Sequence, residues 1–254
     1  MMDYFDPESA PSLIVRHRAE PLRGQWAAAA TISLLAVTIL CFAALICADF
    51  LRSDRNVTFQ SRSRIGGFAN PQFARLKREE EERQATKQRV AMVTQGIAAG
   101  TLFMCLVSAC CFLRWLRYAQ RNLTNLKAAG VSDRSGFFVL ACVIPGVNLF
   151  MPYNIVQETW KASDPLATEN HHAWRDVPSA LFIWSWWIFS LTACLHFCIL
   201  FWMMYSSSNV EMMIDSRIAG SAFAIAALGL LIAVILSITR RQRKRRIYLF
   251  AYTS

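Results

Sequence analysis

The side chains that could carry out chemistry are few and lie apart along the chain. Glu158 stands among apolar residues, where a carboxylate could relay a proton or bind a ligand. His196 lies inside a long apolar run, and the adjacent His171 and His172 could bind a metal ion. Adjacent histidines point in different directions, and no third ligand accompanies them. We therefore expect no metal site, an interfacial Glu158 and a satisfied structural role for His196.

The cysteines do not form a reactive pattern either. All eight lie inside apolar runs: Cys41, Cys47, Cys105, Cys110, Cys111, Cys142, Cys194 and Cys198. Cysteine packs as a small hydrophobe, so we expect buried packing residues. No pair has the Cys-x-x-Cys spacing of zinc or redox sites. Without a nucleophile–base set, a phosphate loop or clustered carboxylates, the sequence predicts neither an enzyme nor a cofactor.

Four uncharged apolar runs are long enough to cross a bilayer, because a crossing helix needs about 20 residues. They cover residues 26–48, 90–113, 179–205 and 218–238. Charged residues make up only 17% of the chain and hydrophobic ones 55%, a balance unlike that of soluble domains. The sequence predicts an all-α, polytopic membrane protein with a membrane domain over 26–239, an N-terminal tail over 1–25 and a basic tail over 240–254.

A fifth uncharged run, residues 135–157, is broken by Pro145 with Gly146, by the polar Asn148 and by Pro152. Proline disrupts a helix interior, and the freed carbonyls must find partners in hydrocarbon. A re-entrant segment shielded by other helices meets that requirement, and a kinked fifth span is the alternative. The positive-inside rule favours five spans, whereas the prolines favour four.

Residues 114–126 project as an amphipathic helix at about 100° per residue. One arc holds Trp115, Leu116, Ala119, Leu123 and Leu126, and the opposite arc holds Arg114, Arg117, Arg121 and Asn125. We expect a helix at the membrane surface with its arginines toward water or phosphate, or one packed on the protein's own helices. Gly130 is expected to end it. A short helix over 153–163 should bring together Ile155, Val156, Thr159 and Trp160.

The charged stretches suggest lipid partners and no nucleic acid. The net charge is +10, and the basic residues flank apolar runs, which favours anionic headgroups. Six cations behind the last span are predicted lipid contacts: Arg240, Arg241, Arg243, Lys244, Arg245 and Arg246. Residues 76–89 carry opposite charges four apart, typical of a solvated helix that leads into the next span. Gly96 and Gly100 would let another helix approach, from a second copy or from the same chain.

The central stretch also carries a motif. Trp115, Ala119 and Asn122 are followed by P-x-x-N-L-x-x-P-Y from Pro145 to Tyr153, and by Glu158-Thr-Trp160. This pattern resembles a bacterial membrane family known as domain of unknown function 4328. An arginine usual three positions after the tryptophan is replaced by Tyr118, and aromatic positions before the proline are Phe137 and Phe138. The resemblance implies a multi-span protein of the bacterial inner membrane, with an N-terminus inside and four spans. It implies no activity.

Three functions compete on these observations. The first is a scaffold or sensor with its central stretch at the membrane interface. The second is a channel or transporter that uses the broken segment, since discontinuous helices line transport sites. The third is a lipid-modifying enzyme with Glu158 or His196 as its base. The candidate motif residues are Trp115, Arg117, Arg121, Asn122, Pro145, Asn148, Pro152, Tyr153, Glu158 and Trp160.

Overall fold

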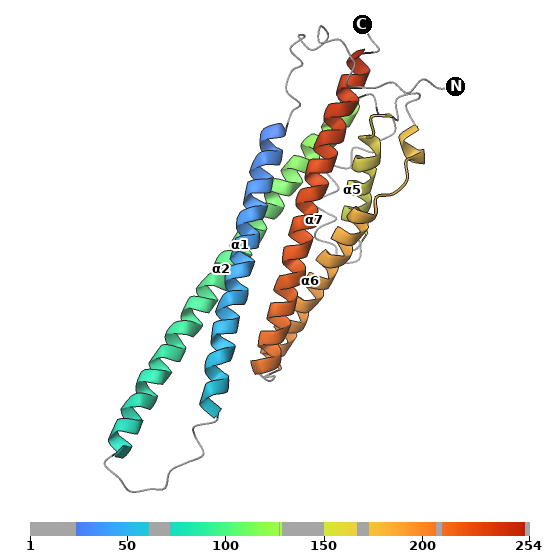
Figure 1. Ribbon diagram of the computed structural model, residues 1–254. Helices are drawn as coiled ribbons and strands as arrows, with labels where there is room; N and C mark the ends of the chain where they lie inside the picture. The colour runs from blue at the N-terminus through green and yellow to red at the C-terminus, as the bar shows by residue number, and fades with distance from the viewer. Residues whose placement is uncertain are drawn as a thin grey trace. The chain divides into compact units, whose positions relative to one another are not determined.

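The computed structural model describes residues 24–60, 72–126, 128, 150–166, 173–206 and 210–251. Its elements are the helices drawn in Figure 1. They are α1 (Gln25–Gln60), α2 (Gln72–Asn125), α5 (Met151–Ala162), the 3-10 helix η3 (Ala173–Asp176), α6 (Leu181–Tyr205) and α7 (Val210–Ala251). The predicted all-helical class is therefore confirmed for the described part of the chain.

Four helices are long and apolar enough to cross a membrane, as predicted. The candidate spans are Gln25–Phe50, Gln84–Asn125, Leu181–Met203 and Met212–Leu249. Only 17 to 33% of the most apolar window of each span is buried inside the protein. So much exposed apolar surface is unfavourable in water and favourable in hydrocarbon. The chain has four candidate spans and is compatible with an integral membrane protein.

Helix α2 contains three stretches that were predicted as separate segments. The acidic and basic lead-in, the second span and the amphipathic stretch form one continuous helix from Gln72 to Asn125. The predicted continuation of the lead-in into the span is confirmed. Residues 114–125 are not a separate surface helix, because no proline interrupts the helical hydrogen bonds where the span ends. Gly130, the predicted helix end, lies outside the described residues.

The broken segment is described only in its last part. Helix α5 begins at Met151 with Pro152 in its first turn, where a missing N–H has no helical partner to lose. The predicted short helix over 153–163 is confirmed. Pro145 and Asn148 lie outside the described residues, and the re-entrant path remains a prediction.

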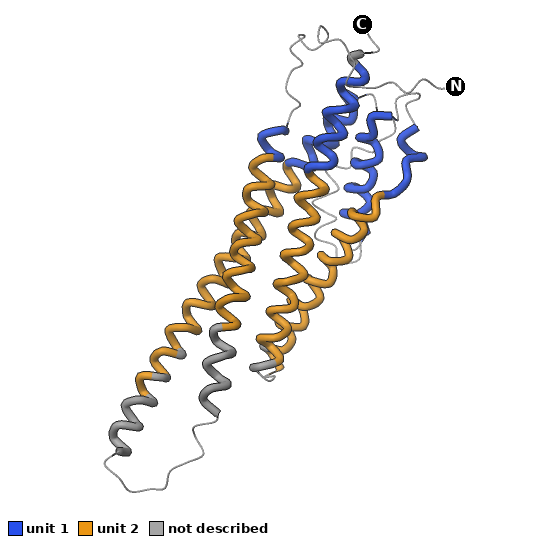
Figure 2. The backbone as a smooth tube through the Cα atoms, in the orientation of Figure 1, with its two compact units in different colours: residues 1–28, 115–179, 236–254 blue, residues 29–114, 180–235 orange. Residues whose placement is uncertain are grey.

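The chain divides into two compact units, coloured in Figure 2. Unit 1 comprises residues 1–28, 115–179 and 236–254, and unit 2 comprises residues 29–114 and 180–235. In unit 2 the hydroxyls of Thr38 and Ser108 form a hydrogen bond of 2.9 Å between α1 and α2. Buried residues of α1, α6 and α7 form an apolar cluster there, namely Phe42, Ala193 and Ala224. Unit 1 contains the motif residues that the structure describes.

Candidate functional site

The amphipathic C-terminal end of α2 packs within unit 1 through its apolar arc. All five residues of the predicted apolar arc are buried, from Trp115 to Leu126. The side chains of Arg114, Arg117, Arg121 and Asn125 on the opposite arc are exposed. The amphipathic projection is therefore confirmed, and its apolar arc is buried in protein. Leu123 and Leu126 pack in one cluster with Ala128, Ala162 and Trp174.

Helix α5 is the second helix that packs within unit 1. Its buried side includes Ile155, Val156, Thr159 and Trp160, the four residues that the sequence predicted to lie together. The indole Nε1–H of Trp160 donates a hydrogen bond of 3.1 Å to Ser237 Oγ on α7. A buried tryptophan needs such a partner for its N–H. Trp160 therefore fixes α5 to the end of α7.

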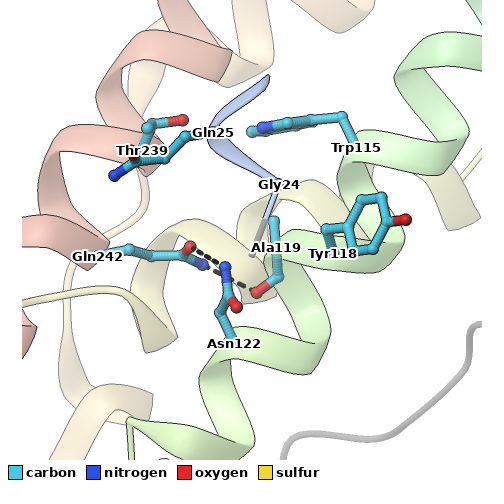
Figure 3. A pocket seen from close by; sticks show the side chains of 8 residues that line it. All are labelled: Gly24, Gln25, Trp115, Tyr118, Ala119, Asn122, Thr239 and Gln242. Carbon is cyan, nitrogen blue, oxygen red and sulfur yellow. Dashed lines mark hydrogen bonds between the residues drawn. The ribbon is translucent and has the colours of Figure 1, made fainter. Parts of the chain in front are cut away.

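Gln242 of α7 forms hydrogen bonds both with α2 and with the C-terminal end of α5. Its side-chain amide donates to the carbonyl oxygen of Ala119 at 2.9 Å and to Ser163 Oγ at 3.3 Å. Asn122 Nδ2 donates to Gln242 Oε1 at 3.4 Å, a long hydrogen bond. Figure 3 shows the two amides facing each other beside Ala119. Both amide side chains are buried, so each needs these partners.

One turn further along α7, the side chain of Arg245 is only 1% exposed. Its Nε donates to the carbonyl of Leu126 at 3.2 Å, and the same guanidinium donates to the carbonyls of Ala162 at 2.9 Å and Asp164 at 3.0 Å. These acceptors lie at the C-terminal ends of α2 and α5, where helices leave carbonyls without partners and carry negative partial charge. Arg245 therefore caps two helices at once. We call Gln242, Arg245 and their partners on α2 and α5 the polar cluster.

Arg241 lies at the edge of this cluster. Its guanidinium forms a salt bridge of 2.8 Å with Asp164 and stacks 3.6 Å from the centroid of the Trp160 ring. The salt bridge is partly exposed, so it contributes little by itself. Together with the cation–π contact it orients Asp164, whose other carboxylate oxygen accepts from the N–H of Leu166.

Arg241 and Arg245 correct the lipid-contact prediction for the basic run. Arg245 is buried in unit 1, and Arg241 is held by Asp164 and Trp160. Arg240, Arg243 and Lys244 are exposed, as a lipid contact requires. The reason is helical periodicity, because residues 241 and 245 continue the buried face of α7.

A small cavity lies beside Gln242 and Asn122, seen in Figure 3. Its uncharged lining consists of Gly24, Gln25, Trp115, Tyr118, Ala119, Asn122, Thr239 and Gln242. The cavity volume is about 10 Å³, roughly the space for one water molecule. Gly24 has φ +99°, and a side chain there would come within 2.7 Å of Tyr118 Cβ. A cavity of this volume has room for about one water molecule and none for a larger ligand.

The other motif residues that the structure describes do not converge on one site. Pro152 is buried at the start of α5, Tyr153 and Glu158 are half-buried, and Arg117 and Arg121 face outward from α2. Burial raises the pKa of the Tyr153 phenol, which favours the neutral form. Among the described residues no three metal-ligating side chains come together.

Two polar residues lack the partners expected of them. Nδ1 of His196 is buried without a hydrogen bond, and its ring stacks on Phe223 with centroids 5.5 Å apart. The prediction of a satisfied histidine is therefore wrong for Nδ1, because one face of the ring packs on Phe223, which offers no hydrogen-bond partner. Both ends of the buried Gln157 amide also lack partners in the described residues. His171 and His172 lie outside those residues.

The cysteine prediction is wrong for most positions. Cys47, Cys110, Cys194 and Cys198 are exposed on the protein, and Cys41, Cys105 and Cys111 are only partly buried. Cys142 lies outside the described residues. In a membrane protein an apolar side chain can face hydrocarbon, so an apolar run does not imply burial within the chain.

Sequence reasoning missed an ion pair in unit 2. Arg217 of α7 binds Asp49 of α1 through two hydrogen bonds, one of them 2.6 Å between Nε and Oδ2. The Asp49 side chain is 1% exposed and that of Arg217 24%. Asp49 lies near the end of the first candidate span and Arg217 near the start of the last. Their positions near span ends were the available signal, and this signal did not identify the two residues as partners.

The GxxxG positions face open space. A methyl group added at Gly96 or Gly100 would meet nothing within 4 Å. No described helix of the same chain therefore packs closely on either glycine. Contact with a second copy remains a prediction.

Comparison with known proteins gives one family. A model of the family described as Domain of unknown function (DUF4328) matches residues 78–243. This range contains α5, α6 and most of α2 and α7. No curated protein and no solved structure matches the chain. The match covers well over half of the sequence, and the chain therefore belongs to the DUF4328 family.

Proposed function

We propose that this membrane protein is a non-enzymatic scaffold, with unit 1 as a platform at the membrane interface. The scaffold would hold the ends of α2, α5 and α7 in one fixed arrangement and present their outward side chains to a partner. The basic residues favour the cytoplasmic side of a bacterial inner membrane for this platform.

The burial of Arg245 carries the proposal. A buried guanidinium is unfavourable unless its donors are satisfied, and here three backbone carbonyls accept from it. If Arg245 moved away, these three carbonyls would lose their donor, and a buried acceptor left without a partner costs about 1–3 kcal/mol. Such an arrangement favours a rigid element over a site that opens to admit a substrate.

The family motif supports the same function. Trp115, Asn122 and Trp160 are buried, and the polar atoms of Asn122 and Trp160 bond to Gln242 and Ser237. These two motif residues thus connect α2 and α5 to α7. A transport site would instead need such groups directed at a solute path.

The test is a distance measurement on the full chain in nanodiscs. Spin labels at exposed Arg121 and half-buried Lys161, in a background without native cysteines, report the α2–α5 distance within unit 1. A scaffold gives one narrow distance distribution that is the same in neutral and anionic bilayers. A sensor gives a distribution that shifts with bilayer charge.

A flux assay separates the transport alternative. The same protein in liposomes should leave ion and small-solute flux at the level of protein-free vesicles. Flux above that level that is lost in Asn148→Ala would favour the channel or transporter and would refute the scaffold.

A further inference from the structure

The basic run of α7 divides into two faces. Arg241 and Arg245 point into unit 1, where Asp164 and the carbonyl groups of the polar cluster hold them. Arg240, Arg243 and Lys244 are exposed, and they fall within an arc of about 100° on the helix. Neither the Arg217–Asp49 nor the Arg241–Asp164 salt bridge of the described residues involves these three cations. We call Arg240, Arg243 and Lys244 the outer cations.

Apolar side chains flank the outer cations on the same side of α7. Leu236, one turn before Arg240, is 38% exposed, and Ile247, one turn after Arg243, is 61% exposed. At 1.5 Å per residue, Arg240 lies about 6 Å and Lys244 about 12 Å beyond Leu236 along the helix. The headgroup layer extends roughly 5–8 Å beyond the hydrocarbon core on each side. With the edge of the hydrocarbon core taken at Leu236, the outer cations fall at the depth of the headgroups or just outside it, within reach of their long side chains.

We propose that the outer cations form a binding site for the phosphate groups of anionic phospholipid headgroups. The proposal rests on the proposed function, because it assumes that unit 1 lies at a membrane surface. Lipid is favoured over nucleic acid because the cations continue a helix whose preceding turns are apolar enough to span a bilayer. The contacts of Arg241 and Arg245 within unit 1 hold the helix in one orientation, so the outer cations keep facing away from these contacts.

The platform makes this site more selective than a mobile basic tail. A flexible tail attracts any anionic surface through net charge alone. Here the contacts of Trp160, Gln242 and Arg245 fix the end of α7 within unit 1. Two guanidiniums and one ammonium therefore lie on one arc of a fixed helix, where they can bind neighbouring phosphate groups at the membrane surface.

The experiment uses the full chain in nanodiscs of phosphatidylcholine and phosphatidylglycerol in a 4:1 ratio. Lipids retained on the extracted protein are quantified by native mass spectrometry. Each cation near an anionic surface contributes roughly fivefold, so the preference of the wild type for phosphatidylglycerol should exceed that of Arg240→Gln/Arg243→Gln/Lys244→Gln by up to about 100-fold. The charge-conserving Arg240→Lys/Arg243→Lys/Lys244→Arg variant should keep most of the preference.

Several outcomes would overturn the proposal. The first is equal phosphatidylglycerol retention by the wild type and the glutamine variant. The second is loss of preference in the charge-conserving variant. The third is full competition by inorganic phosphate at constant ionic strength, which would assign the site to free phosphate. The fourth is binding of a single-stranded RNA to the wild type, lost in the glutamine variant, by a protein that shows no preference for phosphatidylglycerol.

The controls separate this proposal from the scaffold. The glutamine variant should keep the wild-type thermal midpoint in pure phosphatidylcholine, because its three side chains are exposed. Solute flux with an intact lipid preference would refute the scaffold and leave the lipid site standing. Absence of both flux and lipid preference would refute only the lipid site.

Discussion

Arg245→Met tests whether the polar cluster holds unit 1 together. The substitution keeps a long apolar side chain and removes every donor to the carbonyls of Leu126, Ala162 and Asp164. A buried acceptor left without a partner costs about 1–3 kcal/mol. Relief of the buried charge offsets part of the sum, so we expect a loss of about 3–5 kcal/mol, as for other broken buried charge contacts.

The matched control is Arg243→Met, which makes the same change two residues earlier on the exposed face of α7. An exposed substitution of this kind changes stability by about 0.5 kcal/mol or less. In thermal unfolding of the purified chain in one detergent, Arg245→Met should lower the midpoint by roughly 6–20 °C relative to the control. Equal midpoints for the two variants would refute the reasoning, because they would mean that the buried guanidinium contributes nothing.

Three further predictions use the same unfolding assay. Gly220→Ala should lower the unfolding midpoint, because the new Cβ would lie 2.9 Å from His196 Cβ and reduce the free energy of unfolding by about 1–3 kcal/mol. The control Gly229→Ala meets nothing within 4 Å and should raise the free energy of unfolding by up to about 1 kcal/mol. Equal shifts of the two midpoints would contradict this reasoning. Asp49→Asn should cost about 3–5 kcal/mol by leaving Arg217 without its carboxylate, and the exchanged pair Asp49→Arg/Arg217→Asp should recover part of that loss. Gly24→Ala should cost about 1–3 kcal/mol because φ is positive and the space is filled, and an unchanged midpoint would count against the geometry there.

The sequence was sufficient for the spans and for the amphipathic arc. Bilayer thickness sets a minimum length for an apolar helix, and the helical period selects the buried face. Both rules act locally, so they need no knowledge of the fold. The five residues from Trp115 to Leu126 were predicted correctly for this reason.

The basic run of α7 was predicted to face lipid as one charged block. Cations are normally solvated, so the helical period of buried positions was not followed into the basic run. Buried positions of α7 recur every three or four residues at Ala227, Leu231, Val234, Ile238, Gln242 and Arg245. Extending the helical period of the span past its last apolar residue would have identified Gln242 and Arg245 as inward-facing.

Partner choice over long sequence distances was not predictable from the chain. Asp49 and Arg217 are separated by 168 residues, and each lies near other polar residues at the end of a span. The spans limit which ends can meet, but packing decides which charges pair. The same holds for the carbonyl groups that Arg245 reaches, because backbone acceptors leave no mark on the sequence.

Hydrogen exchange across α5 in nanodiscs tests the central claim most directly. A helix of 12 residues is only at the lower limit of the roughly 12–15 residues that isolated helices need in water, so slow exchange there must come from its contacts within unit 1. The scaffold predicts strong protection of Met151–Ala162 in the wild type, and its loss in Arg245→Met while α6 stays protected. Fast exchange in the wild-type α5, or protection unchanged by Arg245→Met, would contradict the account.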